Sequence, residues 1–166
     1  NMELIDIIPE FNLYEELWKI YTKADAIPPQ YISADAHIER SIIGESTEVY
    51  GTVKNSVIGS GVIIEEGAQV VDSIIMQNTV VGRNARIQKA IIADNVEIGE
   101  NVEIGVGEEA PSKLDAKIYA SDLVTIGENS YIPADVKIGK NTAVSGVTES
   151  SDYPDGLLES GGYIIK

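Results

Sequence analysis

Residues 55–105 read NSVIGSGVIIEEGAQVVDSIIMQNTVVGRNARIQKAIIADNVEIGENVEIG. Within this stretch an aliphatic residue returns at every sixth position, as at Ile58, Ile64 and Val70. A step of six matches neither the helical period of 3.6 nor the strand period of 2. It matches a coil with three short flat sides, each of which points one aliphatic side chain into a triangular core.

The six-residue count also restarts at regular intervals. Doubled aliphatic residues end at Ile43, Ile58, Ile75 and Ile92, and these restarts are 15, 17 and 17 residues apart. After a break, the count resumes at Ile126. The chain has 25 Ile and 15 Val but only 7 Leu, which favours strands over helices. We therefore predict an all-β fold, a parallel β-helix of hexapeptide repeats with about six coils at residues 32–145.

The segments outside the repeat have different patterns. In residues 1–31, Asn12 is a helix N-cap followed by apolar residues at helical spacing up to Trp18, which predicts a short helix. The pair Pro28-Pro29 predicts an extended linker into the first coil.

Two further segments depart from the repeat after it has begun. Residues 105–123 interrupt the coil count, and we expect a loop excursion that leaves one corner. The tail, residues 146–166, is rich in turn residues and either caps the last coil or stays loose.

Composition excludes several classes of function. The chain has 27 acidic and 12 basic residues and a net charge of −15, which excludes nucleic acid and anionic membranes as main partners. It has no Cys, which excludes disulfide scaffolds, cysteine nucleophiles and thiolate metal sites. A single His excludes a metal site built from several imidazoles. With no apolar stretch long enough for a membrane span, we expect a soluble, cytoplasmic protein.

The sequence contains few candidate catalytic residues. His37 begins a coil, and hexapeptide-repeat acyltransferases use a His as general base; the alternative is an exposed corner residue. Arg83, Arg86 and Lys89 place three cations within seven residues of an acidic chain. Because they avoid the inward positions, we expect them to project outwards, either as an anion site for a phosphorylated effector or as a salt-bridge network.

The whole pattern resembles a known family. Residues 4–22, followed by Pro28-Pro29-Gln30-Tyr31-Ile32, are similar to the interdomain junction of bacterial glucose-1-phosphate adenylyltransferases (ADP-glucose pyrophosphorylases). In that family the junction joins an N-terminal nucleotidyltransferase domain to a C-terminal left-handed β-helix. The Ser-Ile-Ile restarts and residues 81–92 match that β-helix as well, so the resemblance covers residues 1–145.

The resemblance implies a function for the parent protein. The parent enzyme would use ATP and Mg²⁺ to convert glucose 1-phosphate into ADP-glucose and pyrophosphate, for glycogen biosynthesis. This chemistry belongs to the N-terminal catalytic domain, so no catalytic residue, metal or cofactor is expected in this chain. The C-terminal domain would contribute allosteric effector sites, with Lys117 as a further candidate, and contacts of a homotetramer.

Two alternatives remain open at this point. The chain could be a free-standing hexapeptide-repeat acyltransferase that acts as a trimer, with His37 as its base. It could also be the β-helix of a non-catalytic paralogous subunit. The predicted helix and proline linker favour the adenylyltransferase, because an acyltransferase needs no junction to an upstream domain.

Overall fold

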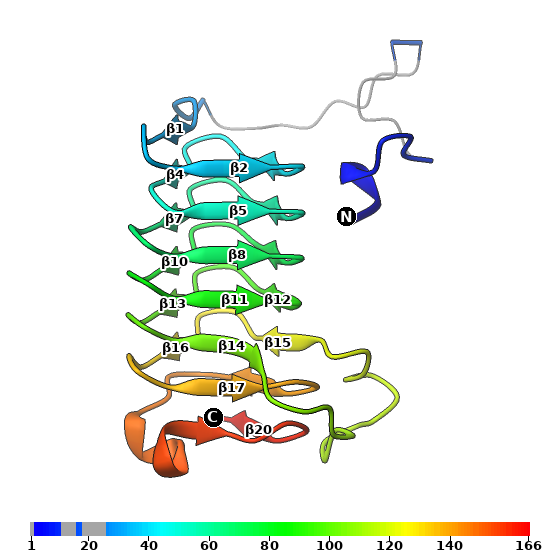
Figure 1. Cartoon of the computed structure of the whole chain (residues 1–166), viewed down its shortest axis with the longest axis vertical. Helices are drawn as coiled ribbons and strands as arrows, with labels where there is room; N and C mark the ends of the chain where they lie inside the picture. Colours follow the sequence, from blue (N-terminus) through cyan, green and yellow to red (C-terminus); the bar gives the residue numbers. More distant parts are fainter. Residues whose placement is uncertain (1, 11–15, 18–25) are drawn as a thin grey trace.

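The computed structural model describes residues 2–10, 16–17 and 26–166. The chain winds into a left-handed parallel β-helix whose three sheets form the sides of a long prism (Figure 1). The fold predicted from the six-residue period is therefore confirmed.

Each coil contributes one short strand to each sheet. Sheet A contains β1 (Tyr31–Ile32), β4 (Glu48–Val49), β7 (Ile63–Ile64), β10 (Val80–Val81), β13 (Glu97–Ile98) and β16 (Tyr131–Ile132). Sheet B contains β2 (His37–Glu39), β5 (Thr52–Lys54), β8 (Gln69–Val71), β11 (Arg86–Gln88), β14 (Glu103–Val106), β17 (Lys137–Gly139) and β19 (Leu157–Leu158). Sheet C contains β3 (Ile42–Ile43), β6 (Val57–Ile58), β9 (Ile74–Ile75), β12 (Ala90–Ile92), β15 (Val124–Ile126), β18 (Ala143–Ser145) and β20 (Tyr163–Ile165).

The residues of the six-residue period fill the core of the prism. The buried side chains include one aliphatic residue from each sheet of coil four, namely Val81, Ile87 and Ile92. The register stacks like residues on like, because Ile92 pairs with Ile75 on one side and with Ile126 on the other. The core is therefore a column of β-branched side chains that runs the length of the molecule.

Polar ladders hold the corners between the sheets. At one corner the Asn95 side chain accepts a hydrogen bond from Asn78 Nδ2 and donates one to Asn129 Oδ1, both at 3.3 Å. All three residues have positive φ, which Asn tolerates better than most residues. At another corner the Oγ atom of the buried Ser73 accepts a hydrogen bond from the backbone N–H of Ala90, at 3.1 Å. This contact explains the serine that precedes the doubled aliphatic residues.

The C-terminal end differs from the prediction in the number of coils. The structure has seven coils rather than about six, and β1, β2 and β3 form the first of them. The extra coil comes from the tail, where β19 pairs with β17 and β20 pairs with β18. Its third side is not a strand but two 3₁₀ turns, Ser150–Asp152 and Pro154–Gly156, and these obscure the period.

Tyr153 fills the core at this end. It lies between the two 3₁₀ turns, is 2% exposed and belongs to the hydrophobic core. Its hydroxyl lies 2.9 Å from Thr148 Oγ1, which satisfies the polar tip. Burial raises the pKa of this phenol above its ordinary value. A tyrosine therefore closes the aliphatic column.

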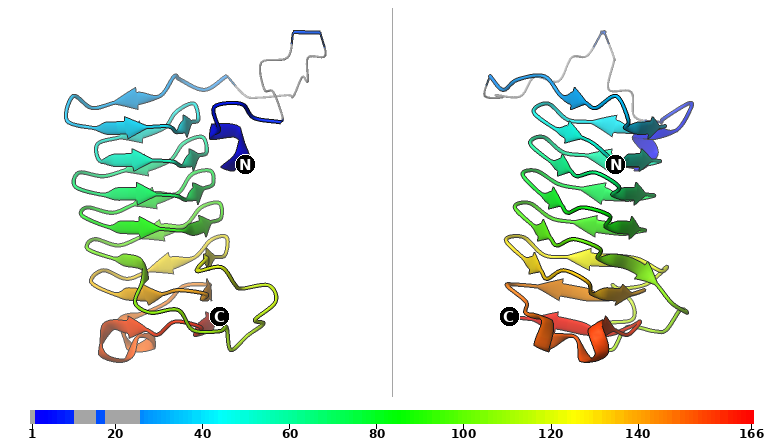
Figure 2. Two further views of the ribbon diagram at one scale, coloured as in Figure 1. Left: turned by 45° about the vertical axis from the view of Figure 1, so that its right-hand side comes forward. Right: turned by 60° about the vertical axis from the view of Figure 1, so that its left-hand side comes forward.

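The N-terminal segment lies beside the upper coils (Figure 2). Met2–Ile5 forms a 3₁₀ turn, and Asp6 Oδ1 lies 3.6 Å from Arg40 Nη2 at the corner between β2 and β3. Apart from Glu16 and Leu17, the helix predicted from Asn12 to Trp18 lies outside the described residues. No helix in the described ranges has the length and apolar character to cross a membrane.

Candidate functional site

The three predicted cations all project outwards, but they lie at different places around coil four. Arg83 is exposed at the corner between sheets A and B, and Arg86 is exposed on the outer face of β11. Lys89 follows the other end of β11, at the corner between sheets B and C. The structure therefore brings Arg83 and Arg86 to one end of the strand and separates Lys89 from them.

Arg86 faces a polar hollow on sheet B. It stands in register between Gln69 of β8 and Glu103 of β14. The Glu103 carboxylate is 3.0 Å from Lys137 Nζ, one coil further along. A hollow of about 480 Å³ surrounds the guanidinium, with the following lining residues: Gly67, Gln69, Asn84, Arg86, Asn101 and Glu103. Arginine and side-chain amides can together bind an anion that carries further oxygen atoms.

Arg83 does not line this hollow but precedes Asn84, which does. Its backbone N–H donates to Glu65 Oε2 at 2.9 Å, and Asn101 N–H donates to its carbonyl. Among the described residues, neither Arg83 nor Arg86 forms an ion pair within 4 Å. Their guanidinium groups are therefore the cations of this cluster that can accept an anion without first losing a carboxylate.

Lys89 is engaged in a different contact. Its Nζ lies 3.6 Å from Asp122 Oδ2, and the same carboxylate oxygen lies 3.6 Å from Lys140 Nζ. The backbone N–H of Asp122 donates to Asn141 Oδ1 at 2.8 Å. Sequence reasoning missed this cluster, because its members are far apart in the chain and meet only where residues 107–123 return to the corner beside Lys89.

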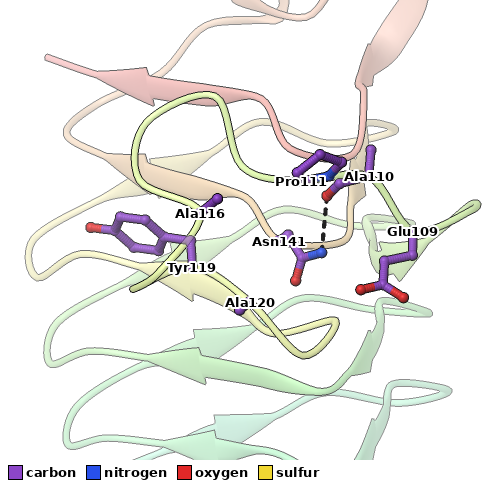
Figure 3. Close-up of a pocket in the computed structure, with 7 residues that line it drawn as sticks. All are labelled: Glu109, Ala110, Pro111, Ala116, Tyr119, Ala120 and Asn141. Carbon is purple, nitrogen blue, oxygen red and sulfur yellow. Dashed lines mark hydrogen bonds between the residues drawn. The ribbon is translucent and has the colours of Figure 1, made fainter.

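A second hollow lies next to the Asp122 cluster. Figure 3 shows the amide of Asn141 directed at the backbone of Ala110, where Nδ2 donates to the carbonyl at 2.9 Å. The cavity has a volume of about 280 Å³ and the following lining residues: Glu109, Ala110, Pro111, Ala116, Tyr119, Ala120 and Asn141. Both polar atoms of the Asn141 side chain are already used, one by Ala110 and one by Asp122. The polar side chains of this cavity that remain for a ligand are therefore those of Glu109 and Tyr119.

The comparison with known proteins is decisive for the family. Residues 28–126 match the family described as GlmU-like, C-terminal hexapeptide. The chain belongs to this family. Over all 166 residues it is 72% identical to the glucose-1-phosphate adenylyltransferase of Lachnospira eligens. It is 54% identical over 165 residues to that of Thermotoga neapolitana and 39% identical over 166 residues to that of Acetivibrio thermocellus. The chain spans 39% of the length of each of these relatives, in their C-terminal part.

Two further candidates can be placed in this hexapeptide-family structure. His37 is exposed at the start of β2, and its neighbour Glu39 pairs with Lys54 Nζ at 2.9 Å. The hydrogen bond and charge of Lys54 hold the pKa of Glu39 below its ordinary value, and the charge of His37 contributes in the same direction. Lys117 is exposed in residues 107–123. Among the described residues, no three His, Asp or Glu side chains gather as metal ligands would.

Proposed function

We propose that this chain is the regulatory and oligomerisation domain of a glucose-1-phosphate adenylyltransferase. The observation that supports this most is the 72% identity that extends over all 166 residues of the chain. The parent protein would act in the cytoplasm on ATP and glucose 1-phosphate, with Mg²⁺, and would release ADP-glucose and pyrophosphate. The nucleotide and metal would be held by the N-terminal catalytic domain.

A direct assay tests this assignment. The 166-residue chain, given ATP, glucose 1-phosphate and Mg²⁺, should release no pyrophosphate above background. The same chain as part of the full-length polypeptide should form ADP-glucose. Pyrophosphate release by the chain alone, or a full-length protein that makes no ADP-glucose, would overturn the proposal.

The regulatory part of the proposal concerns Arg83 and Arg86, with Lys89 as the third cation. Arg86 lines a polar hollow of about 480 Å³, and Arg83 is adjacent in sequence to its lining residue Asn84; two guanidinium groups without an ion pair suit a phosphorylated effector. Lys89 would have to exchange its contact with Asp122 for the ligand, so its contribution should be smaller. In a chain with a net charge of −15, cations that have no ion pair reduce the repulsion of an anion locally.

The effector site can be tested in the full-length enzyme. Arg83→Ala with Arg86→Ala should raise the concentration of AMP, inorganic phosphate or a sugar bisphosphate needed for half-maximal response by about tenfold or more. Lys54→Ala is the matched control, because it removes a cation from the same sheet that pairs with Glu39, outside the hollow. A double variant with the full effector response would overturn the site. Loss of the tetramer would instead assign these residues to assembly.

The proposed assembly has its own support on sheet C. The outward residues of its first four strands are all aliphatic, namely Ile42, Val57, Ile74 and Ile91. Parallel strands with aliphatic residues on both faces are typical of sheets that are covered on both sides. We therefore assign this face to contacts with the catalytic domain or with another subunit of the tetramer.

A further inference from the structure

Residues 107–123, here called the strap, leave the β-helix after β14 and return to it at β15. All of these residues are described, and they form no strand. In Figure 1 the strap hangs beside the last coils, on the side of β15 and β20. It therefore spans coil six, formed by β17 and β18, and reaches coil seven, formed by β19 and β20.

The strap is bound to both coils. Its Lys113 N–H donates to the carbonyl of Gly161 in coil seven at 2.7 Å. Its Ala110 carbonyl accepts a hydrogen bond from Asn141 of coil six. Gly161 also donates its N–H to Lys140 of coil six at 2.8 Å, so one turn joins all three segments.

The approach of the strap to Gly161 leaves no space for a side chain. A Cβ on Gly161 would lie 2.2 Å from the Pro111 carbonyl oxygen, and Gly161 has a φ of +75°. By contrast, Gly156 in the same tail has a φ of +72°, but its Cβ would lie 3.7 Å from its nearest neighbour, the Asp135 carbonyl oxygen. The two glycines therefore share a backbone conformation and differ in contact with the strap.

The return end of the strap is fixed by charge. Asp122 joins Lys89 of coil four to Lys140 of coil six through one carboxylate oxygen, at 3.6 Å from each. Ser121 and Asp122 have φ values of +63° and +66°, which cost free energy in residues with a side chain. This cluster, with the hydrogen bond to Asn141, holds the strained end in place.

Coil seven depends on such contacts. Its strands β19 and β20 have two and three residues, and each is the last strand of its sheet. Short edge strands are marginally stable without further contacts. A hollow of about 280 Å³ lies between the strap and Asn141 of coil six, and none of the strap residues belongs to the hydrophobic core, so hydrogen bonds and ion pairs are the main contacts of the strap.

We propose that the strap locks coil seven onto the β-helix, with the Lys89–Asp122–Lys140 cluster as its latch, and that strap and coil seven open together as one unit. Opening detaches β19 and β20 and exposes the lower edges of β17 and β18. An exposed strand edge can pair with another chain. The device would therefore control access to the C-terminal end of the β-helix.

Amide hydrogen exchange of the 166-residue chain tests the coupling. In the wild type, segments 108–114 and 157–165 should open with equal free energy, below that of β8 and β9. Gly161→Ala should speed exchange in both segments by about tenfold or more. Gly156→Ala strains coil seven through a φ of +72° without meeting the strap, and should speed exchange in segment 108–114 as well, because the two segments open together. Unequal opening of the two segments, or a Gly161→Ala variant in which only one of them changes, would overturn the proposal.

Asp122→Asn tests the latch in a variant that keeps the backbone of the strap. Asn tolerates positive φ and retains the N–H donated to Asn141, but it loses both ion pairs. At low salt both segments should exchange about threefold faster than in the wild type, and at high salt the difference should vanish. Unchanged exchange at low salt would show that the cluster is not the latch.

Discussion

On β9, Ile75 is 1% exposed in the core, while its neighbour Ile74 lies half-buried on the outer face of sheet C. On β11, Ile87 is likewise buried, but its neighbour on the outer face of sheet B is Arg86. The inward residues are thus alike in the two sheets, and the outward residues are opposite in character. The core determines the fold, and the outer faces are left to determine what the molecule binds.

The outward ladders of the two sheets show this difference in the first four coils. On sheet B they run His37, Thr52, Gln69, Arg86, Glu103, Lys137 and Leu157. On sheet C they run Ile42, Val57, Ile74, Ile91, Thr125, Ala143 and Tyr163. One face is suited to a polar or anionic ligand, and the other is suited to a protein surface.

The largest effect should come from a charge placed inward. Ile98→Asp buries an unpaired carboxylate in a core where Ile98 is 1% exposed, and should lower the free energy of unfolding by more than about 4 kcal/mol. Urea denaturation followed by circular dichroism measures this. Glu97→Gln, the exposed neighbour on β13, is the control and should change stability by less than about 0.5 kcal/mol. Similar losses of unfolding free energy in the two variants would contradict the claim that the inward residues determine the fold.

The corner ladders should give an intermediate effect. Asn95→Ala loses two side-chain hydrogen bonds and keeps a φ of +57°, which should cost about 1–2 kcal/mol. Asn95→Gly loses the same hydrogen bonds without the conformational penalty and should cost less than Asn95→Ala. Urea midpoints compare the two variants. If glycine costs as much as alanine, positive φ is not what selects Asn at this corner.

A smaller effect on stability is expected at Tyr153, a core residue whose phenol can lose a proton. Because burial raises its pKa, its contribution to stability is complete below the ordinary tyrosine pKa of about 10 and is lost as pH rises through the higher folded pKa. Tyr153→Phe should cost about 1 kcal/mol at neutral pH through the lost contact with Thr148. It should also reduce the fall in stability above about pH 10. An unchanged alkaline profile would contradict this account.

The regular part of the fold could be predicted because its environments repeat. Ile58, Ile75 and Ile92 face the same core at successive levels, so their spacing in the sequence reports their position in space. Coil seven has no such signal, since Tyr153 and two 3₁₀ turns stand where a strand would be. The number of coils was therefore wrong by one, while the class of fold was right.

The candidate site was harder to predict than the fold. Arg83, Arg86 and Lys89 avoid the inward positions, and the structure shows all three exposed. The sequence did not show that Lys89 lies apart from Arg86. The two residues are only three positions apart in the chain, but they lie at opposite ends of β11. The contact between Lys89 and Asp122 depends on the path of the strap, which has no period of its own.

An exchange of faces tests most directly the claim that inward residues determine the fold and outward residues determine binding. Val57→Thr, Ile74→Gln and Ile91→Arg together give sheet C the outward residues of sheet B. Stability of the 166-residue chain should fall by less than about 2 kcal/mol in total. The full-length protein should lose either the proposed tetramer, measured by light scattering, or the packing of the catalytic domain against the β-helix, measured by limited proteolysis. A chain that no longer folds, or a full-length protein unchanged in both measurements, would contradict the account.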